Sequence, residues 1–197
     1  MKNLLLRTRL LVLLAGLLLA APALWSCNTE TAPAKALREH EEKMTRIDED
    51  TIRNYLTRNN LLSTATRTNS GLYLVTLATG TGTPVTTGSR VRVKYIGRFL
   101  SNGAQPGSTG YPASSGDPRY PQGAIFDNSA DKGATCGCVV FVAGGLTKGF
   151  DEGLLRMRQG DRKLLLVPSR LAYGSGGNAG IPPDSALLFD VEILEVF

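Results

Sequence analysis

The chain has 197 residues, of which 22 are lysine or arginine and 17 are aspartate or glutamate, with one histidine and three cysteines. This length allows one ordinary domain with a sizeable core and some additional segments. Three of the basic residues lie in the first nine positions, and the rest of the chain is close to neutral. This balance gives little support to an anionic partner, and we expect no binding to nucleic acid.

The first 26 residues have the pattern of a secretory signal. A basic start precedes the apolar run at 10–21, which is too short for a stable membrane-spanning helix, and a small residue, Ser26, precedes Cys27. The arrangement resembles a bacterial lipoprotein signal, which implies that Cys27 is the lipidated first residue of the mature chain. Acyl chains anchor a protein to a membrane without spanning it. We therefore expect a lipoprotein of the bacterial cell envelope that faces the periplasm or the cell surface, with a plain cleaved signal as the alternative.

A flexible tether is predicted at 27–34, followed by a helical N-terminal extension at 35–69. The extension is rich in charged residues and carries an imperfect apolar stripe with helical spacing, and a break is expected near Asp48. Two interpretations stay open. In the first, residues 35–60 pack on their own domain or form a solvated spacer. In the second, they form an arm that binds clients or makes a homodimer.

From residue 71 onward the apolar spacing changes to that of strands. Apolar and basic residues alternate in RVRVKYIGRF, which predicts a half-buried antiparallel strand. Further short strands are predicted around LYLVTLAT, AIFDNS, CVVFVAG, RKLLLVP and ALLFDVEILEVF, and TKGFDEGLLRMRQG fits one short helix ending at Gly160. The predicted fold class of 71–197 is α+β, with an antiparallel sheet of about five strands and one short helix on one face. Residues 101–124, rich in glycine and proline, indicate a functional loop or a disordered insertion.

Several kinds of catalysis lack the residues that they need. The single histidine, His40, lies in the predicted N-terminal helix, so no Ser-His-Asp or Cys-His set can form around the sheet, and no residues have metal-ligand spacing. The glycine-rich loop at 174–177 lacks the lysine of a phosphate-binding loop, and prolines follow where a helix would have to begin. We expect no metal and no cofactor. Cys136 and Cys138 are either two free thiols or a local disulfide.

Rotation about a prolyl peptide bond is a reaction that needs neither a metal nor strong acid–base chemistry. Its barrier of about 18–20 kcal/mol arises from amide resonance, and the two isomers differ by only about 0.5–1 kcal/mol. A catalyst therefore needs only to favour the twisted amide. An apolar, aromatic-walled pocket removes the water that stabilises the planar amide, and one or two donors can hold the neighbouring carbonyl.

Four segments occur in the order VKYIG, IFDNS, KGFDEGLLRMRQGDRKLLLVP and AYGSGGNAGIPPDSALLFDVEIL. In this order they resemble the FKBP-type peptidyl-prolyl isomerases over residues 71–197. The resemblance implies an antiparallel sheet half-wrapped around the short helix, with a proline pocket between them. It also implies that the protein accelerates rotation of X-Pro bonds in proline-containing polypeptide clients, here exported proteins.

The resemblance also implies roles for individual residues. The positions that match the catalytic pocket are the walls Tyr95, Phe126 and Phe189, the carboxylate Asp127, the floor Phe150, the hydroxyl of Tyr173 and the cap Ile181. The positions that match the substrate-binding edge are Val139, Leu146 and Thr147. Phe150 stands where the family most often has tryptophan, which makes the floor smaller. A non-catalytic chaperone or adaptor, which binds proline-containing or unfolded clients in the same pocket, is the alternative function.

Overall fold

The structure is a computed structural model that describes residues 31–100 and 124–197. The predicted signal, the predicted lipidation site Cys27, half of the predicted tether and nearly all of the insertion lie outside the described residues. Within the described ranges, no helix combines the length and the apolar character needed to cross a membrane. The chain divides into two units after Arg38, and the whole sheet belongs to the second unit.

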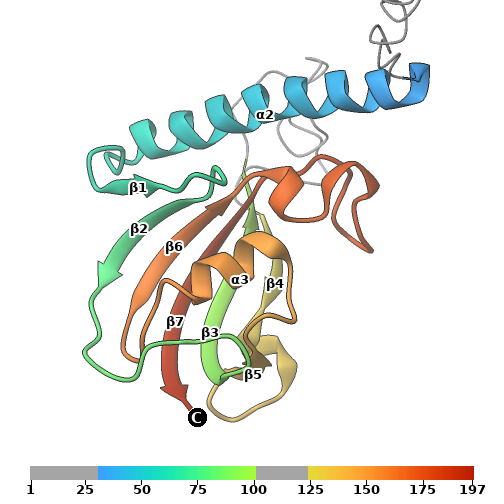
Figure 1. Cartoon of the computed structure of the whole chain (residues 1–197). Helices are drawn as coiled ribbons and strands as arrows, with labels where there is room; N and C mark the ends of the chain where they lie inside the picture. Colours follow the sequence, from blue (N-terminus) through green and yellow to red (C-terminus); the bar gives the residue numbers. More distant parts are fainter. Residues whose placement is uncertain (1–30, 101–123) are drawn as a thin grey trace, which may run out of the picture. The chain divides into compact units, whose positions relative to one another are not determined.

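The second unit is built on one antiparallel sheet of seven strands (Figure 1). The strands are β1 (Ala65–Arg67), β2 (Tyr73–Ala78), β3 (Arg90–Phe99), β4 (Ile125–Asn128), β5 (Val139–Val142), β6 (Arg162–Val167) and β7 (Leu187–Val196). Their spatial order is β1-β2-β6-β7-β3-β4, and β5 pairs with the same edge of β3 as β4 does. The predicted α+β fold is confirmed, but the predicted number of about five strands is wrong. Strand β1 lies in the segment predicted to be helical, and β4 and β5 are two separate short strands.

Helix α3 (Lys148–Leu154) covers the inner face of the sheet (Figure 1). Two glycines one turn apart, Gly149 and Gly153, allow this close approach, because a Cβ at either position would lie 2.4 Å from a side-chain atom on β6. The helix ends well before the predicted end at Gly160. The amides of Arg156 and Met157 donate to carbonyls three residues back, at Gly153 and Leu154, which tightens the chain into a turn.

The main core lies between α3 and the sheet. Val91, Val93 and Tyr95 on β3 are all buried in it, as the alternation in RVRVKYIGRF predicts. Strand β7 contributes every second side chain in the same way, namely Leu187, Phe189, Val191 and Ile193. Because successive side chains of a strand point to opposite faces, both strands present their intervening polar residues to the outer face.

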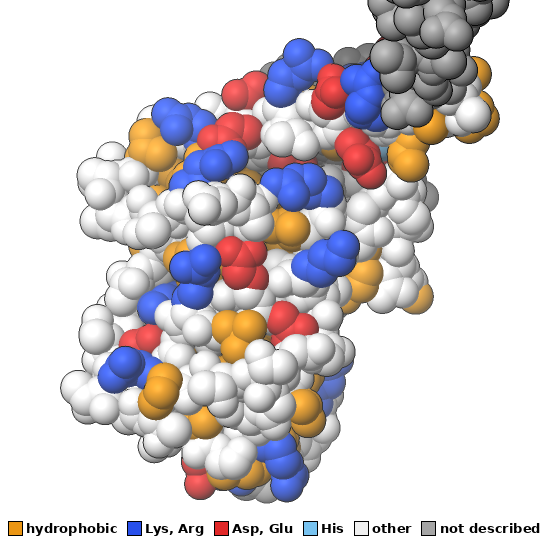
Figure 2. All heavy atoms as spheres, in the orientation of Figure 1, with side chains coloured by type: hydrophobic (Ala, Val, Ile, Leu, Met, Phe, Trp, Pro, Cys, Tyr) orange, Lys and Arg blue, Asp and Glu red, His pale blue; other side chains and the backbone are white. Residues whose placement is uncertain are grey.

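Helix α2 (Ala32–Arg58) is continuous, with no break at Asp48, and it begins inside the predicted tether. In the second unit it lies on the outer face of the sheet, where Ile52 and Leu56 are fully buried in a second core. The sheet side of that core consists of Tyr73, Val75, Leu164, Leu166 and Leu188, together with Leu100 and Ala186 beside it. Figure 2 shows basic and acidic side chains intermixed along the opposite, solvent side of α2. This part of α2 therefore packs on its own domain.

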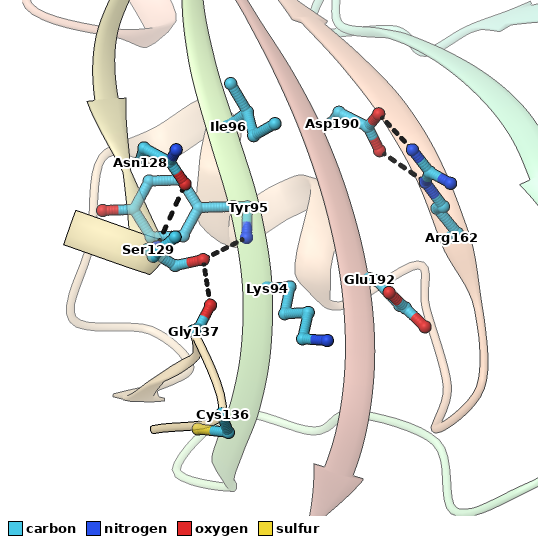
Figure 3. A pocket seen from close by; sticks show the side chains of 11 residues that line it. Lys94, Tyr95, Ile96, Asn128, Ser129, Cys136, Gly137, Arg162, Asp190 and Glu192 are labelled. Atoms are coloured by element: carbon cyan, nitrogen blue, oxygen red, sulfur yellow. Dashed lines mark hydrogen bonds and ion pairs between the residues drawn. The ribbon is translucent and has the colours of Figure 1, made fainter. Parts of the chain in front are cut away.

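The loop between β4 and β5 contains a disulfide near its end. Cys136 and Cys138, whose Cα atoms are 5.2 Å apart, are bonded, so of the two alternatives the structure contains the disulfide. The loop begins with a short 3₁₀ helix, η2 (Ser129–Lys132). Ser129 Oγ accepts a hydrogen bond from the Tyr95 amide at 3.0 Å and donates to the Gly137 carbonyl at 2.7 Å (Figure 3). These bonds hold the loop against β3.

Candidate active site

A cavity of about 180 Å³ lies between the inner face of the sheet and α3. Its lining comes from β3, β4, β5, β7, α3 and two loops, which are far apart in the sequence. The lining residues are Tyr95, Phe126, Asp127, Phe141, Leu146, Thr147, Phe150, Tyr173 and Phe189. Most of them are aromatic, so the cavity combines an apolar interior with a few polar groups, which is the usual composition of a small-ligand site.

Phe150 is the centre of the aromatic walls. Its ring lies edge-on to Phe189, with centroids 4.9 Å apart, and edge-on to Tyr95 at 6.0 Å and Phe141 at 5.9 Å. Phe126 lies edge-on to Phe189 at 5.7 Å. Edge-to-face packing at these distances is favourable and holds each ring in one orientation. The walls are therefore rigid before any ligand enters.

One corner of the cavity is polar. The Tyr95 hydroxyl donates to Asp127 Oδ2 at 2.5 Å, while Lys132 Nζ pairs with Asp127 Oδ1 at 2.6 Å. The Asn128 amide also donates to Asp127 Oδ1, at 2.9 Å. Because a carboxylate accepts several hydrogen bonds, Asp127 connects β3, β4 and η2 at one point.

These contacts decide the charge state of the corner. Burial raises the pKa of Asp127, but hydrogen bonds from Lys132 and Tyr95 outweigh it, so that the pKa lies below its ordinary value. Burial, together with the hydrogen bond to Asp127, raises the pKa of Tyr95 far above its ordinary value. At neutral pH the corner therefore holds a carboxylate and a neutral phenol that donates to it.

The loop before α3 forms one edge of the cavity. Asp151, in the first turn of α3, accepts hydrogen bonds from the amides of Gly144 and Leu146, both at 2.8 Å. This arrangement fixes Leu146 and Thr147 at the cavity edge. Among residues 31–100 and 124–197 no group accepts a hydrogen bond from the Thr147 amide, so this donor is free.

Tyr173, in the loop between β6 and β7, also lines the cavity. Its hydroxyl has no hydrogen-bond partner within the described part of the chain. The glycines that follow turn the chain: Gly174, Gly177 and Gly180 all have positive φ, which glycine adopts without strain. Ile181, predicted to cap the pocket, is instead 7% exposed in the core and does not line the cavity.

Two of the residues at the site differ from the sequence prediction. The wall position expected at Val139 belongs to Phe141, which lines the cavity and lies 5.7 Å from Tyr95 between ring centroids. The two residues share the inner face of β5, so the alternation of the strand contained this signal. Lys132 had no such signal, because only the path of the loop brings its ammonium group to Asp127.

A larger groove, of about 390 Å³, lies on the outer face of the sheet (Figure 3). It is bordered by charged side chains, including Lys94, Glu192 and an ion pair in which Arg162 donates to both oxygens of Asp190 at 2.9 and 2.8 Å. Such a surface does not exclude water and does not suit a proline ring. In the part of the chain that the structure describes, no group of three histidine, cysteine, aspartate or glutamate side chains could hold a metal ion.

The sequence is similar to known isomerases. The family model described as FKBP-type peptidyl-prolyl cis-trans isomerase matches residues 82–194. FkpA of Escherichia coli K12, an FKBP-type peptidyl-prolyl cis-trans isomerase, is 43% identical over 74 residues, which are 38% of this chain and 26% of FkpA. FK506-binding protein 4 of Gibberella zeae is 37% identical over 117 residues, which are 59% of this chain and 19% of that protein. The chain thus spans about a quarter or less of the length of these curated relatives.

Solved structures have the same fold. The crystal structure of Escherichia coli FkpA superposes with a TM-score of 0.56 and 25% identity, over 85% of this chain and 74% of that chain. A peptidyl-prolyl cis-trans isomerase from Pseudomonas syringae pv. tomato also has a TM-score of 0.56, over 79% of this chain and 94% of that chain. At 24% identity, the second likeness concerns the fold alone. Because the family model covers more than half of the sequence, the chain belongs to the FKBP-type peptidyl-prolyl cis-trans isomerase family.

Proposed function

We propose that this domain is a peptidyl-prolyl cis–trans isomerase that accelerates rotation of X-Pro bonds in exported proteins. The observation that carries the proposal is the pre-packed aromatic cavity lined by the Thr147 amide and the Tyr173 hydroxyl, two donors that no acceptor among the described residues occupies. Membership of the family supports it.

Desolvation is the main contribution expected from the cavity. Water stabilises the planar, charge-separated amide more than the twisted one, so transfer of the X-Pro bond to an aromatic environment lowers the barrier. The barrier in water is about 18–20 kcal/mol, and the rate rises tenfold for each 1.4 kcal/mol or so by which the barrier is lowered. The proline ring would rest on Phe150, which has neighbouring rings on three sides.

The polar groups act on the carbonyls beside the rotating bond. Tyr173 and the Thr147 amide would each donate to a substrate carbonyl and hold the flanking chain while the central bond turns. Asp127 keeps the Tyr95 ring in place through its hydroxyl and presents a negative charge to the bound amide. None of these roles transfers a proton, so we expect the rate to vary little between pH 6 and pH 8.

An isomerase assay with an Ala-Leu-Pro-Phe peptide tests the proposal. We expect acceleration by the wild-type protein, and a loss of about twofold to tenfold in kcat/KM for Tyr173→Phe, because one hydrogen bond contributes about 0.5–1.5 kcal/mol. Asp127→Ala should lose at least as much. Tyr55→Phe, which removes a hydroxyl on α2 away from the cavity, is the matched control. No acceleration by the wild type, or full activity of both site variants, would contradict catalysis.

The non-catalytic chaperone remains the alternative function. It predicts that the protein suppresses aggregation of a proline-free client equally well with and without the Tyr173→Phe substitution, in the absence of measurable isomerase activity. We propose no homodimer through residues 35–60, because Ile52 and Leu56 are already buried against the domain's own sheet.

We further propose that the protein is anchored to a membrane of the bacterial cell envelope by acyl chains on Cys27. The support for this proposal is the signal pattern of residues 1–27. Mass spectrometry of the N-terminal peptide tests it. A diacylglyceryl-modified Cys27, and release of the Cys27→Ala variant from membranes, are the expected results; an unmodified cysteine at that position would contradict the proposal.

A further inference from the structure

The loop between β6 and β7 carries one edge of the cavity, and both of its ends contact helix α2. We call residues 169–184 the lip segment; it contains η3 (Ser169–Leu171), Tyr173 and η4 (Gly174–Gly176). Only Tyr173 of this segment lines the cavity. At each end of the lip segment, one side chain of α2 makes hydrogen bonds to it.

The first contact is at the start of the lip segment. Asp48 Oδ2 accepts hydrogen bonds from the amide of Ser169 at 2.8 Å and from its hydroxyl at 2.7 Å. Asp48 is only 1% exposed. Two hydrogen bonds to one residue fix both the backbone and the side chain of Ser169, so the first turn of the lip segment is tied to α2.

The second contact is at the end of the lip segment. His40 Nε2 lies 3.1 and 3.0 Å from the two carboxylate oxygens of Asp184, and since a carboxylate only accepts, the imidazole donates. The Asp184 amide in turn donates to the carbonyl of Gly174 at 2.8 Å. Gly174 follows Tyr173 directly. A chain of two hydrogen bonds therefore connects His40 to the residue beside the cavity edge.

Both contacts come from one rigid helix. His40 and Asp48 are about two helical turns apart, and the buried Met44 lies between them. Both ends of the lip segment have further support, because Leu171 and Ile181 are buried in the main core. Residues 174–180 between them include four glycines, and all seven are partly or fully exposed. A glycine-rich segment samples many conformations unless its ends are held.

We propose that His40 and Asp48 are positioning residues of the candidate active site, which hold the two ends of the lip segment on α2 and so keep Tyr173 at the cavity edge. The effect on catalysis rests on the proposed isomerase function, whereas the effect on the lip segment does not. The apparent affinity for substrate is proportional to the fraction of free protein in which Tyr173 is at the cavity edge, so it falls when that fraction falls. The loss is expected in KM, because bound substrate itself orders the lip.

Charged side chains lie around both contacts. Asp184, Arg170 and Glu41 surround the imidazole, and Asp184 and Arg170 also act on Asp48. Burial raises the pKa of Asp48 to about 6, whereas the two hydrogen bonds from Ser169 lower it and therefore favour the carboxylate.

Hydrogen exchange and kinetics on the full chain test the proposal with His40→Ala, His40→Gln and Lys43→Ala. A partly exposed charged pair contributes up to about fivefold in an equilibrium constant. His40→Ala should therefore raise amide exchange in 174–184 by about threefold to fivefold and KM by a similar factor, with kcat unchanged. His40→Gln retains a donor near the position of Nε2 and should bring both the exchange rate and KM most of the way back to the wild-type values. Lys43→Ala, an exposed residue of the same helix, should match the wild type.

Two results would overturn the proposal. One is unchanged exchange in 174–184 for His40→Ala; the other is an equal increase in β3 and β7, which indicates a general loss of stability. Asp48→Asn, which keeps an acceptor for Ser169, provides a second variant if His40→Ala does not fold, and it should keep the wild-type exchange of 169–173. If the wild type has no isomerase activity, the proposed function fails while the exchange measurements still decide whether α2 holds the lip.

Discussion

Asp48 is a carboxyl group at a position where an ion is costly. It is 1% exposed, and although Ser169 donates two hydrogen bonds to Oδ2, no described residue donates to Oδ1. Burial raises its pKa to about 6 from an ordinary 3.8; the bonds from Ser169 lower it, and the charge of Asp184 raises it further. The folded protein therefore holds the proton more tightly than the unfolded chain does.

The consequence for stability follows from this difference. Below 3.8 the carboxyl is protonated in both states. Between 3.8 and about 6 the unfolded chain releases the proton while the folded state keeps it, so about 3 kcal/mol of stability is lost by the pH at which the folded state also deprotonates. Asparagine stays neutral over the whole range. We therefore expect the free energy of unfolding of Asp48→Asn, relative to the wild type, to rise by up to about 3 kcal/mol between pH 4 and pH 7.

Urea unfolding followed by far-ultraviolet circular dichroism at pH 4, 5, 6, 7 and 8 measures this difference. The comparison of two proteins at each pH cancels the titration of all other groups. Asp50→Asn, an exposed carboxylate on the same helix, should show a difference that does not depend on pH. A constant difference for Asp48→Asn, or one that decreases as the pH rises, would refute the assignment of a buried, proton-holding carboxyl.

Two further predictions concern packing. Gly153→Ala places a Cβ 2.4 Å from the Leu165 side chain and should lower the free energy of unfolding by about 1–3 kcal/mol. Gly145→Ala, whose Cβ would have ordinary contacts, should change it little; equal effects in urea unfolding would argue against the close helix–sheet contact. Phe141→Ala should reduce isomerase kcat/KM severalfold while Val139→Ala should not, and the reverse order would restore Val139 as the wall.

Much of the fold could be predicted from local patterns. The alternation in RVRVKYIGRF identified the buried face of β3, and the same rule on β7 placed Phe189 and Val191 in the core. The order of motifs pointed to the residues that converge on the cavity, because in this family each motif occupies a set position on the sheet. Eight of the ten expected site residues, all except Val139 and Ile181, line the cavity together with Phe141.

The sequence by itself determined the local elements, because the period with which apolar, aromatic and charged side chains recur depends only on neighbours along the chain. Only the tertiary structure decided which distant groups meet. Lys132 reaches Asp127 because Ser129 holds the loop between β4 and β5 against β3. His40, excluded from the sheet by its place in the N-terminal helix, meets Asp184 in the lip segment. These contacts depend on the register of the strands and on the burial of Ile52 and Leu56 between α2 and the sheet. Both are decided by the free energy of the whole domain and not by that of any one segment.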